Sequence, residues 1–125
     1  MTDSPLVLCA DDDEDILSLV ALRLERAGYR VVRATDGRQA LDRARELRPD
    51  VIVLDVMMPK RSGVEVLTEL RADPALAATR VILLSARVQD SDVDRGLGAG
   101  ADAYLAKPFK AAELVTMVER LLNRV

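Results

Sequence analysis

The sequence predicts one α/β domain over residues 1–125, in which a doubly wound parallel sheet is covered by helices on both faces in a three-layer sandwich. Short, mostly β-branched apolar runs alternate with stretches whose apolar residues recur at helical spacing. Turn and helix-breaking residues separate these segments. Half of the 125 residues are hydrophobic, which suffices for one core. Alternating strands and helices imply right-handed crossovers, and therefore parallel strands.

The first half of the chain predicts three strands and two helices. Strands are expected over residues 6–10, 29–34 and 51–54, the last being apolar on both alternating faces and therefore covered on both sides. The first helix follows the acidic cluster 11–15 and ends at Gly28, which can take the left-handed conformation. The second follows the turn 35–37 and ends before Pro49, because proline stops a helix.

The second half predicts two strands and three helices. A loop over residues 58–63 precedes a helix that carries apolar residues from Val64 to Leu70 and weakens at Asp73-Pro74. A strand over 81–84 ends in Ser85, and a helix is expected over 88–97. A short strand over 101–106 leads to Lys107-Pro108-Phe109 and a last amphipathic helix over about 111–123.

Composition excludes several classes of function. The chain has no histidine, which excludes mechanisms that need an imidazole on this chain. Its one cysteine, Cys9, lies in an apolar run and is expected to be a small buried hydrophobe. A net charge of −3, no basic stripe and few aromatic residues argue against nucleic-acid binding by this domain. Without a long apolar stretch or a signal peptide, we expect a cytoplasmic protein that does not bind membranes.

Polar residues stand directly after the predicted strands, where the carboxyl ends of parallel strands meet at one edge of the sheet. Carboxylates clustered there would repel one another by roughly 4 kcal/mol per pair at about 4 Å, so they need a cation or must take up protons. Mg²⁺ suits such a cluster, because it prefers oxygen ligands. The residues expected at this edge are Asp11 and Asp12 after the first strand, Asp55 after the third, Ser85 after the fourth and Lys107 after the fifth.

Simpler explanations exist for some of these residues. Taken alone, Asp55 could simply be a charged residue that ends a strand or caps the segment that follows. Asp13, Glu14 and Asp15 are typical of a helix start, which leaves the two preceding aspartates as metal candidates. Ser85 suits either a helix cap or a donor to a phosphate-like oxygen. Lys107 is one of three lysines among 18 basic residues, and its compact ammonium suits a single phosphate-like oxygen.

Together these residues resemble the receiver domain of two-component response regulators. The resemblance covers residues 5–123 and implies a flavodoxin-like fold with strand order 2-1-3-4-5. It rests on spacings that agree at once: Asp11-Asp12 after the first strand, Asp55 followed by Met58-Pro59 and Gly63, Ser85 at 30 positions beyond Asp55, and Lys107-Pro108 at 52 positions beyond it.

The resemblance implies a chemistry for the site. Asp55 would accept a phosphoryl group from the phosphohistidine of a sensor histidine kinase or phosphotransfer protein. Asp11, Asp12, Asp55 and the main-chain carbonyl of Met57 would bind Mg²⁺. Lys107 would hold a phosphoryl oxygen, and the family usually has a cis bond before the following proline. Such a domain is a phosphoacceptor that assists its own phosphorylation and dephosphorylation, and it is not an enzyme in the ordinary sense.

The resemblance also implies a switch and partners. Ser85 would hold a second phosphoryl oxygen, and Tyr104 would turn inward as Ser85 moves towards the phosphoryl group. The face formed by the fourth helix, fifth strand and fifth helix would then change and control a downstream effector or a C-terminal output domain. Phosphorylation could drive homodimerisation, although Ala103 replaces an acid common in the transcription-factor subfamily, where a salt-bridged dimer uses it.

Two other hypotheses compete with that of a phosphorylation-dependent switch. A receiver-like module could bind a partner constitutively without being phosphorylated, although the intact set of site residues argues against this. A Mg²⁺-dependent phosphohydrolase with an aspartyl nucleophile could use a similar fold, but such enzymes generally carry a second acid two residues after the nucleophile, where this chain has Met57. Nucleotide enzymes are disfavoured because the glycine-rich phosphate-binding motifs are absent from the sequence.

Overall fold

The computed structural model describes residues 4–85 and 100–123, and these form a sheet with helices on both sides. The helix expected over residues 88–97 lies outside the described residues. The elements in chain order are β1 (Leu6–Ala10), α1 (Glu14–Arg26), β2 (Arg30–Ala34), α2 (Gly37–Leu47), β3 (Val51–Asp55), α3 (Gly63–Ala72), β4 (Arg80–Ser85), β5 (Ala103–Ala106) and α5 (Ala111–Leu122).

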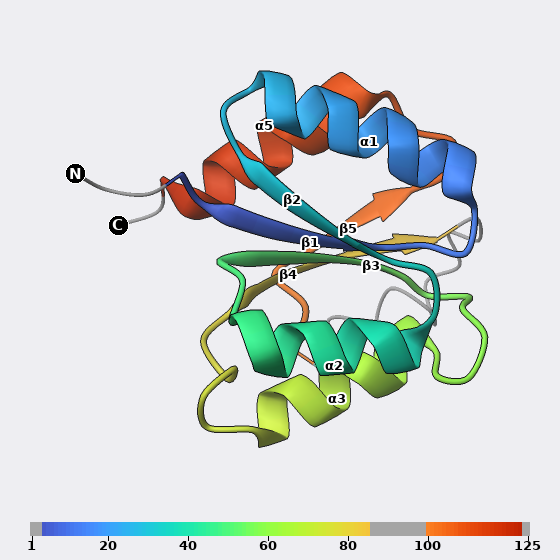
Figure 1. The fold of residues 1–125 in the computed structure, drawn as a ribbon, viewed down its shortest axis with the longest axis vertical. Helices are drawn as coiled ribbons and strands as arrows, with labels where there is room; N and C mark the ends of the chain where they lie inside the picture. The colour runs from blue at the N-terminus through green and yellow to red at the C-terminus, as the bar shows by residue number, and fades with distance from the viewer. Residues whose placement is uncertain (1–3, 86–99, 124–125) are drawn as a thin grey trace.

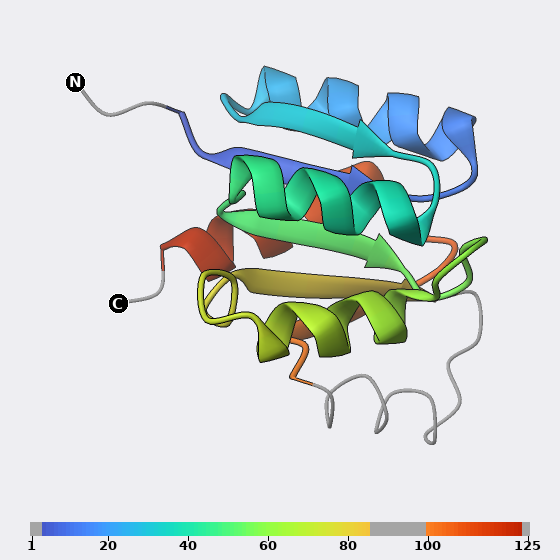
Figure 2. The same cartoon turned by 60° about the horizontal axis from the view of Figure 1, so that its bottom comes forward.

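The five strands are parallel and lie in the order β2-β1-β3-β4-β5, as the sequence predicted. Helices α1 and α5 cover one face of the sheet, and α2 and α3 cover the other (Figure 1). The turned view in Figure 2 shows β1, β2 and β3 ending at the same edge of the sheet. The doubly wound, flavodoxin-like three-layer fold is therefore confirmed. Within the described part of the chain, no helix combines the length and apolar character needed to cross a bilayer.

The core divides into two clusters because successive strand residues point to opposite faces. Leu8, Ile52 and Leu83 belong to the cluster on one face, together with buried residues of α2 and α3. Val7 and Val53 belong to the other, together with buried residues of α1 and α5. The central strands are thus apolar on both sides, as expected of a covered parallel sheet.

Helix ends follow the local sequence. Asp13 caps α1, since its carboxylate accepts from the N–H groups of Asp15 and Ile16. Gly28 takes φ +100° just beyond α1, as predicted from its conformational freedom. Ser62 and Glu65 form a reciprocal capping box at the start of α3. Cys9 is buried, and burial raises the pKa of its thiol to about 12, so it behaves as a small hydrophobe.

The start of β5 differs from the prediction. The strand begins at Ala103, whereas the apolar pattern suggested residue 101. The carboxylate of Asp102 accepts the N–H of Val81 at 2.8 Å, while the N–H of Asp102 donates to the Val81 carbonyl. At this position the Asp102 side chain, rather than a main-chain carbonyl, accepts the Val81 N–H. Regular pairing between β4 and β5 therefore begins only after Asp102.

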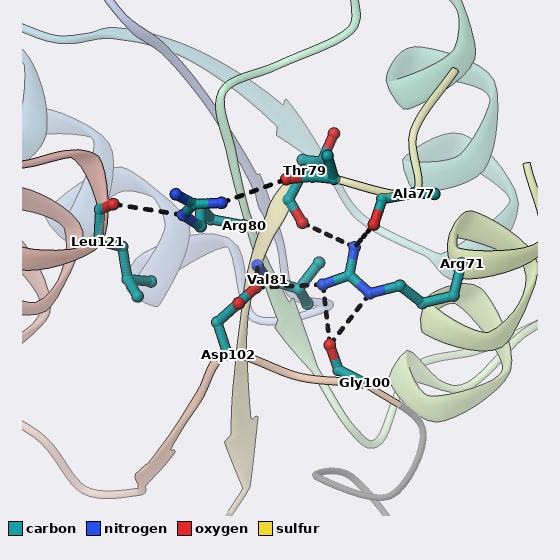
Figure 3. A network of polar contacts seen from close by, with 9 residues as sticks. Arg71, Ala77, Thr79, Arg80, Val81, Gly100, Asp102 and Leu121 are labelled. Atoms are coloured by element: carbon teal, nitrogen blue, oxygen red, sulfur yellow. Dashed lines mark hydrogen bonds and ion pairs between the residues drawn. The ribbon is translucent and has the colours of Figure 1, made fainter. Parts of the chain in front are cut away.

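Arg71 ties α3 to the starts of β4 and β5 (Figure 3). Its Nε and one terminal nitrogen donate to the Gly100 carbonyl at 3.0 and 2.8 Å. The other terminal nitrogen donates to the carbonyls of Ala77 and Thr79 at 3.1 and 2.7 Å. The pair with Asp102 at 3.1 Å uses the remaining donor, so all five guanidinium N–H groups are occupied.

We predict that Arg71→Lys lowers the free energy of unfolding by about 2 kcal/mol, because an ammonium cannot satisfy acceptors spread around a planar fork. Urea denaturation measures this. Arg38→Lys is the matched control. Among the described residues, Arg38 has only an exposed pair with Asp42, so the substitution should change stability by less than about 0.5 kcal/mol. Equal losses in the two variants would contradict the assigned role of Arg71.

Candidate functional site

Sheet register brings the predicted site residues together at the carboxyl ends of the strands. Ala10 of β1 pairs with Leu54 of β3, so the next residues, Asp11 and Asp55, are neighbours across the two strands. Asp55 is the last residue of β3 rather than the first residue beyond it. Lys107 directly follows β5, and its N–H donates to the Ser85 carbonyl at the end of β4.

Lys107 joins the two buried carboxylates. Its Nζ lies 2.7 Å from Oδ2 of Asp11 and 3.1 Å from Oδ2 of Asp55. Asp11 is 2% exposed and Asp55 4% exposed, so neither carboxylate is compensated mainly by water. The second oxygen of each accepts a main-chain N–H, from Asp13 and Met57 respectively. The Lys107-Pro108 bond is cis, as the resemblance implied.

Asp12 completes an acidic cluster with these two residues. Carboxylate oxygens of Asp11, Asp12 and Asp55 lie within 4.8 Å of one another, and Asp12 is exposed while the other two are buried. Opposite ligands of an octahedral Mg²⁺ are separated by about 4 Å, so the spacing and the hard oxygen donors fit this ion. With one ammonium against three carboxylates, the cluster carries two net negative charges, which one divalent cation balances.

The pKa of Asp55 is raised from its ordinary value of 3.8 to about 6. Burial is the main cause and the charge of Asp11 adds to it, while Lys107 and the Met57 N–H oppose the shift. Burial lowers the pKa of Lys107, but its bonds and charge interactions with Asp11 and Asp55 outweigh this and raise it overall. The ammonium therefore stays charged, and the ionised Asp55 carries an electrostatic penalty when no metal is bound.

Ser85 is the last residue of β4, and Tyr104 lies in the neighbouring strand β5. Leu83 pairs with Tyr104 and Ser85 with Ala106, so alternation places Ser85 and Tyr104 as diagonal neighbours on one face. Tyr104 is half-buried against the core cluster of that face, and Ser85 is 3% exposed. Their proximity is compatible with the predicted coupling between the two residues.

A tight loop over residues 56–62, which includes Met57, connects β3 to α3. The Val56 N–H donates to the Leu84 carbonyl at 2.8 Å, and the Gly63 N–H donates to the Val56 carbonyl at 3.0 Å. A Cβ on Gly63 would collide with the carbonyl oxygen of Asp55, which explains why glycine suits that position. Met57 is 72% exposed, and its main-chain N–H contacts the Asp55 carboxylate.

Sequence reasoning missed the residues that contact this loop from α2. Asp36 was read only as part of a turn, yet it caps α2 and faces Lys60 of the loop. The Asp36 N-cap followed three residues later by Gln39 is a recognisable helix-start signal. Contact with a loop more than twenty residues away had no such signal in the sequence.

Comparisons with known proteins give the family. The sequence model of the response regulator receiver domain matches residues 7–119. The chain belongs to the response regulator receiver domain family. Transcriptional regulatory protein PrrA of Mycobacterium tuberculosis is 50% identical over 121 residues, which are 97% of this chain and 51% of PrrA. The receiver domain thus spans about half the length of this curated relative.

Solved structures agree with this assignment. The receiver domain of Francisella response regulator 1452 has a TM-score of 0.89 and 39% identity, covering 94% of this chain and 96% of that one. The receiver domain of sensor histidine kinase PA1611 from Pseudomonas aeruginosa has a TM-score of 0.89 and 32% identity, covering 97% and 99%. In that structure a magnesium ion is coordinated in the active-site cleft.

We predict that in EDTA at pH 7.5 Asp55→Asn is more stable than the unsubstituted receiver domain by about 3 kcal/mol. The Asp55 carboxyl has its ordinary pKa of 3.8 in the unfolded chain and about 6 when folded. Between pH 3.8 and about pH 6, the Asp55 carboxyl is protonated in the folded protein but ionised in the unfolded chain. The free energy of unfolding therefore falls as the pH rises from about 4 to about 6.

Urea denaturation of both proteins at pH 4 and pH 7.5 measures this effect. The stability difference should be small at pH 4 and reach its full size above pH 6. A difference that is the same at both pH values would show that the ionised Asp55 carries no such penalty.

Proposed function

We propose that this receiver domain is a phosphorylation-dependent signalling switch that accepts a phosphoryl group on Asp55 from a sensor histidine kinase or phosphotransfer protein. The observation that supports this most is the arrangement around one carboxylate. Asp55 is buried at the carboxyl edge of the sheet, with an ammonium on one oxygen and two further carboxylates within reach of a shared cation. Such a site suits transfer of an anionic group to the Asp55 oxygen.

The residues present fit a magnesium site. Asp11, Asp12 and Asp55 would hold the ion together with the main-chain carbonyl of Met57, and the cluster needs about two positive charges to balance it. The ion would offset negative charge on the transferred group. A similar receiver domain, that of PA1611, has magnesium in its active-site cleft. The other proposed ligand is the main-chain carbonyl of Met57, and the N–H of the same residue donates to the Asp55 carboxylate.

Phosphoryl transfer to Asp55 requires little covalent chemistry from the protein. An oxygen of the Asp55 carboxylate forms a bond to phosphorus as the phosphorus–nitrogen bond to the donor imidazole breaks, and the imidazole leaves with that electron pair. The Lys107 ammonium is placed to donate to a phosphoryl oxygen once it no longer spans Asp11 and Asp55. Ser85 would donate to a second oxygen. The residues of the site therefore position the groups and balance charge.

An apolar groove next to Lys107 offers room for a protein donor to dock. It has a volume of about 410 Å³ and is lined by Ile16, Leu19, Val20, Lys107, Pro108 and Phe109. Leu19 is 55% exposed on α1, so the groove has an open apolar wall. A helix that carries the donor histidine could therefore pack here while its phosphoryl group reaches Asp55.

The output would be a shift between two packings of the sheet edge. Movement of Ser85 towards the phosphoryl group would leave space near its diagonal neighbour Tyr104, which could then turn inward. The altered face would include β5 and α5 and act on a downstream effector or a C-terminal output domain. PrrA, about twice as long as this chain, is a transcriptional regulatory protein, which supports an output of that kind.

Homodimerisation on phosphorylation is a further expectation about that face. Ala103 supplies no acid to a salt-bridged contact, and the neighbouring Asp102 already accepts from Arg71 and the Val81 N–H. A dimer through this face would therefore depend on other residues.

Phosphorylation by a small donor tests the proposal. With acetyl phosphate and Mg²⁺, the receiver domain should gain the mass of one phosphoryl group, and Asp55→Asn should gain none. Asp12→Ala should be labelled much more slowly at limiting Mg²⁺, by about tenfold or more, because it loses a metal ligand. Intact-protein mass spectrometry over time measures all three.

Asp13→Asn is the matched control. It removes one exposed negative charge next to Asp12 but keeps a capping side chain on α1, so labelling should stay close to normal. If Asp12→Ala were labelled normally at limiting Mg²⁺, the metal role would be wrong. No mass gain in the unsubstituted protein would favour the constitutive module, and sustained hydrolysis of phosphate esters over many turnovers would favour a phosphohydrolase.

A further inference from the structure

The first turn of α2 packs against the middle of the loop over residues 56–62, although α2 supplies no residue to the carboxylate cluster. The Gly37 N–H donates to the Pro59 carbonyl at 3.2 Å. A Cβ on Gly37 would collide with the Arg61 carbonyl oxygen and lie 2.6 Å from the Arg61 Cβ. Since those are mostly main-chain atoms, a larger residue at position 37 must push the loop away.

Asp36 adds a second contact from the same turn. One of its oxygens accepts the Gln39 N–H at 2.8 Å and caps α2, while the other lies 3.5 Å from Nζ of Lys60. The Asp36 side chain is 10% exposed, but that of Lys60 is 67% exposed, so the pair contributes little energy. The pair instead orients the loop, because Lys60 is the residue of the loop that adopts the left-handed conformation, with φ +68°.

The loop is also fixed where it leaves and rejoins the sheet edge. Val56 is hydrogen-bonded to the Leu84 carbonyl, and Gly63 is bonded to the Val56 carbonyl and lies against the Asp55 carbonyl. Gly37 therefore holds the middle of a loop whose two ends are already placed. Met57 stands between one fixed end and the point that Gly37 contacts.

We propose that Gly37 is a positioning residue for the metal site, with Asp36 in support: their contact with the loop sets where the Met57 carbonyl stands relative to Asp11 and Asp55. The inference rests on the proposed magnesium site. A loop held in place before the ion arrives has less conformational freedom to lose on binding, so the contact strengthens Mg²⁺ affinity without touching the ion.

Gly37→Ala tests this in the unphosphorylated protein. The added methyl group should displace the loop and weaken Mg²⁺ binding by about tenfold, as is typical when a group that orients a metal ligand is disturbed. Isothermal titration with MgCl₂ measures the dissociation constant, and thermal unfolding in EDTA measures stability in parallel.

Gly28→Ala is the matched control. It also replaces a glycine at a helix end, and its φ of +100° makes alanine strained, but within the described residues no atom beyond its chain neighbours lies within 4 Å of the new Cβ. It should lower the melting temperature and leave Mg²⁺ affinity unchanged. If Gly37→Ala lowers stability yet binds Mg²⁺ as tightly as Gly28→Ala does, the contact is merely structural and the inference is wrong.

A measurement on the unsubstituted protein keeps the inference testable if Gly37→Ala does not fold. In an NMR titration with MgCl₂, the Gly37 amide should shift with the same midpoint as the Asp12 amide, while the Gly28 amide stays in place. An unshifted Gly37 amide would overturn the inference even where Asp12 responds normally. Failure of Asp12 itself to respond would instead overturn the proposed metal site on which the inference depends.

Discussion

The site depends on one interaction, the Lys107 ammonium held between the carboxylates of Asp11 and Asp55. Two buried carboxylates at the ends of adjacent strands are tolerable because one cation contacts both, at 2.7 and 3.1 Å. Compensation is incomplete, since the pKa of Asp55 remains raised by burial and by the charge of Asp11. The cluster with Asp12 is thus left short of positive charge, and its carboxylate oxygens could hold a divalent cation.

The polar network of Arg71 and the residues of the candidate site lie at opposite ends of the strands. Arg71 and Asp102 tie α3, β4 and β5 together at the amino ends of the strands, opposite the carboxylate cluster. Apolar clusters on both faces fix the strand register that makes Asp11 and Asp55 neighbours. At the carboxyl end of β3 the chain instead turns through a tight loop, which is held by glycines at positions 37 and 63. Small movements of such a loop would change the geometry of the proposed metal site without disturbing the core.

Much of the fold followed from the sequence, because apolar alternation and breaker residues are local signals. The strands β1, β3 and β4, the cap at Asp13 and the end of α1 near Gly28 were all expected. Convergence of Asp11, Asp55 and Lys107 was predictable, since parallel strands end at one edge. The start of β5 was not, because an Asp102 side chain replaces a main-chain acceptor. Neither the five bonds of Arg71 nor the approach of Gly37 to Arg61 has a local signal, since each joins segments that only the folded chain brings together.

We propose that Asp55, rather than its acidic neighbours, carries the phosphoryl group. Treating the acetyl phosphate-labelled protein with borohydride reduces an acyl phosphate to an alcohol, and peptide mass mapping then locates the reduced side chain. We predict reduction at position 55 alone, because Asp55 ends the buried strand β3, where both Lys107 and the Met57 N–H contact its carboxylate. Reduction at Asp11 or Asp12 with position 55 unchanged would contradict the claim.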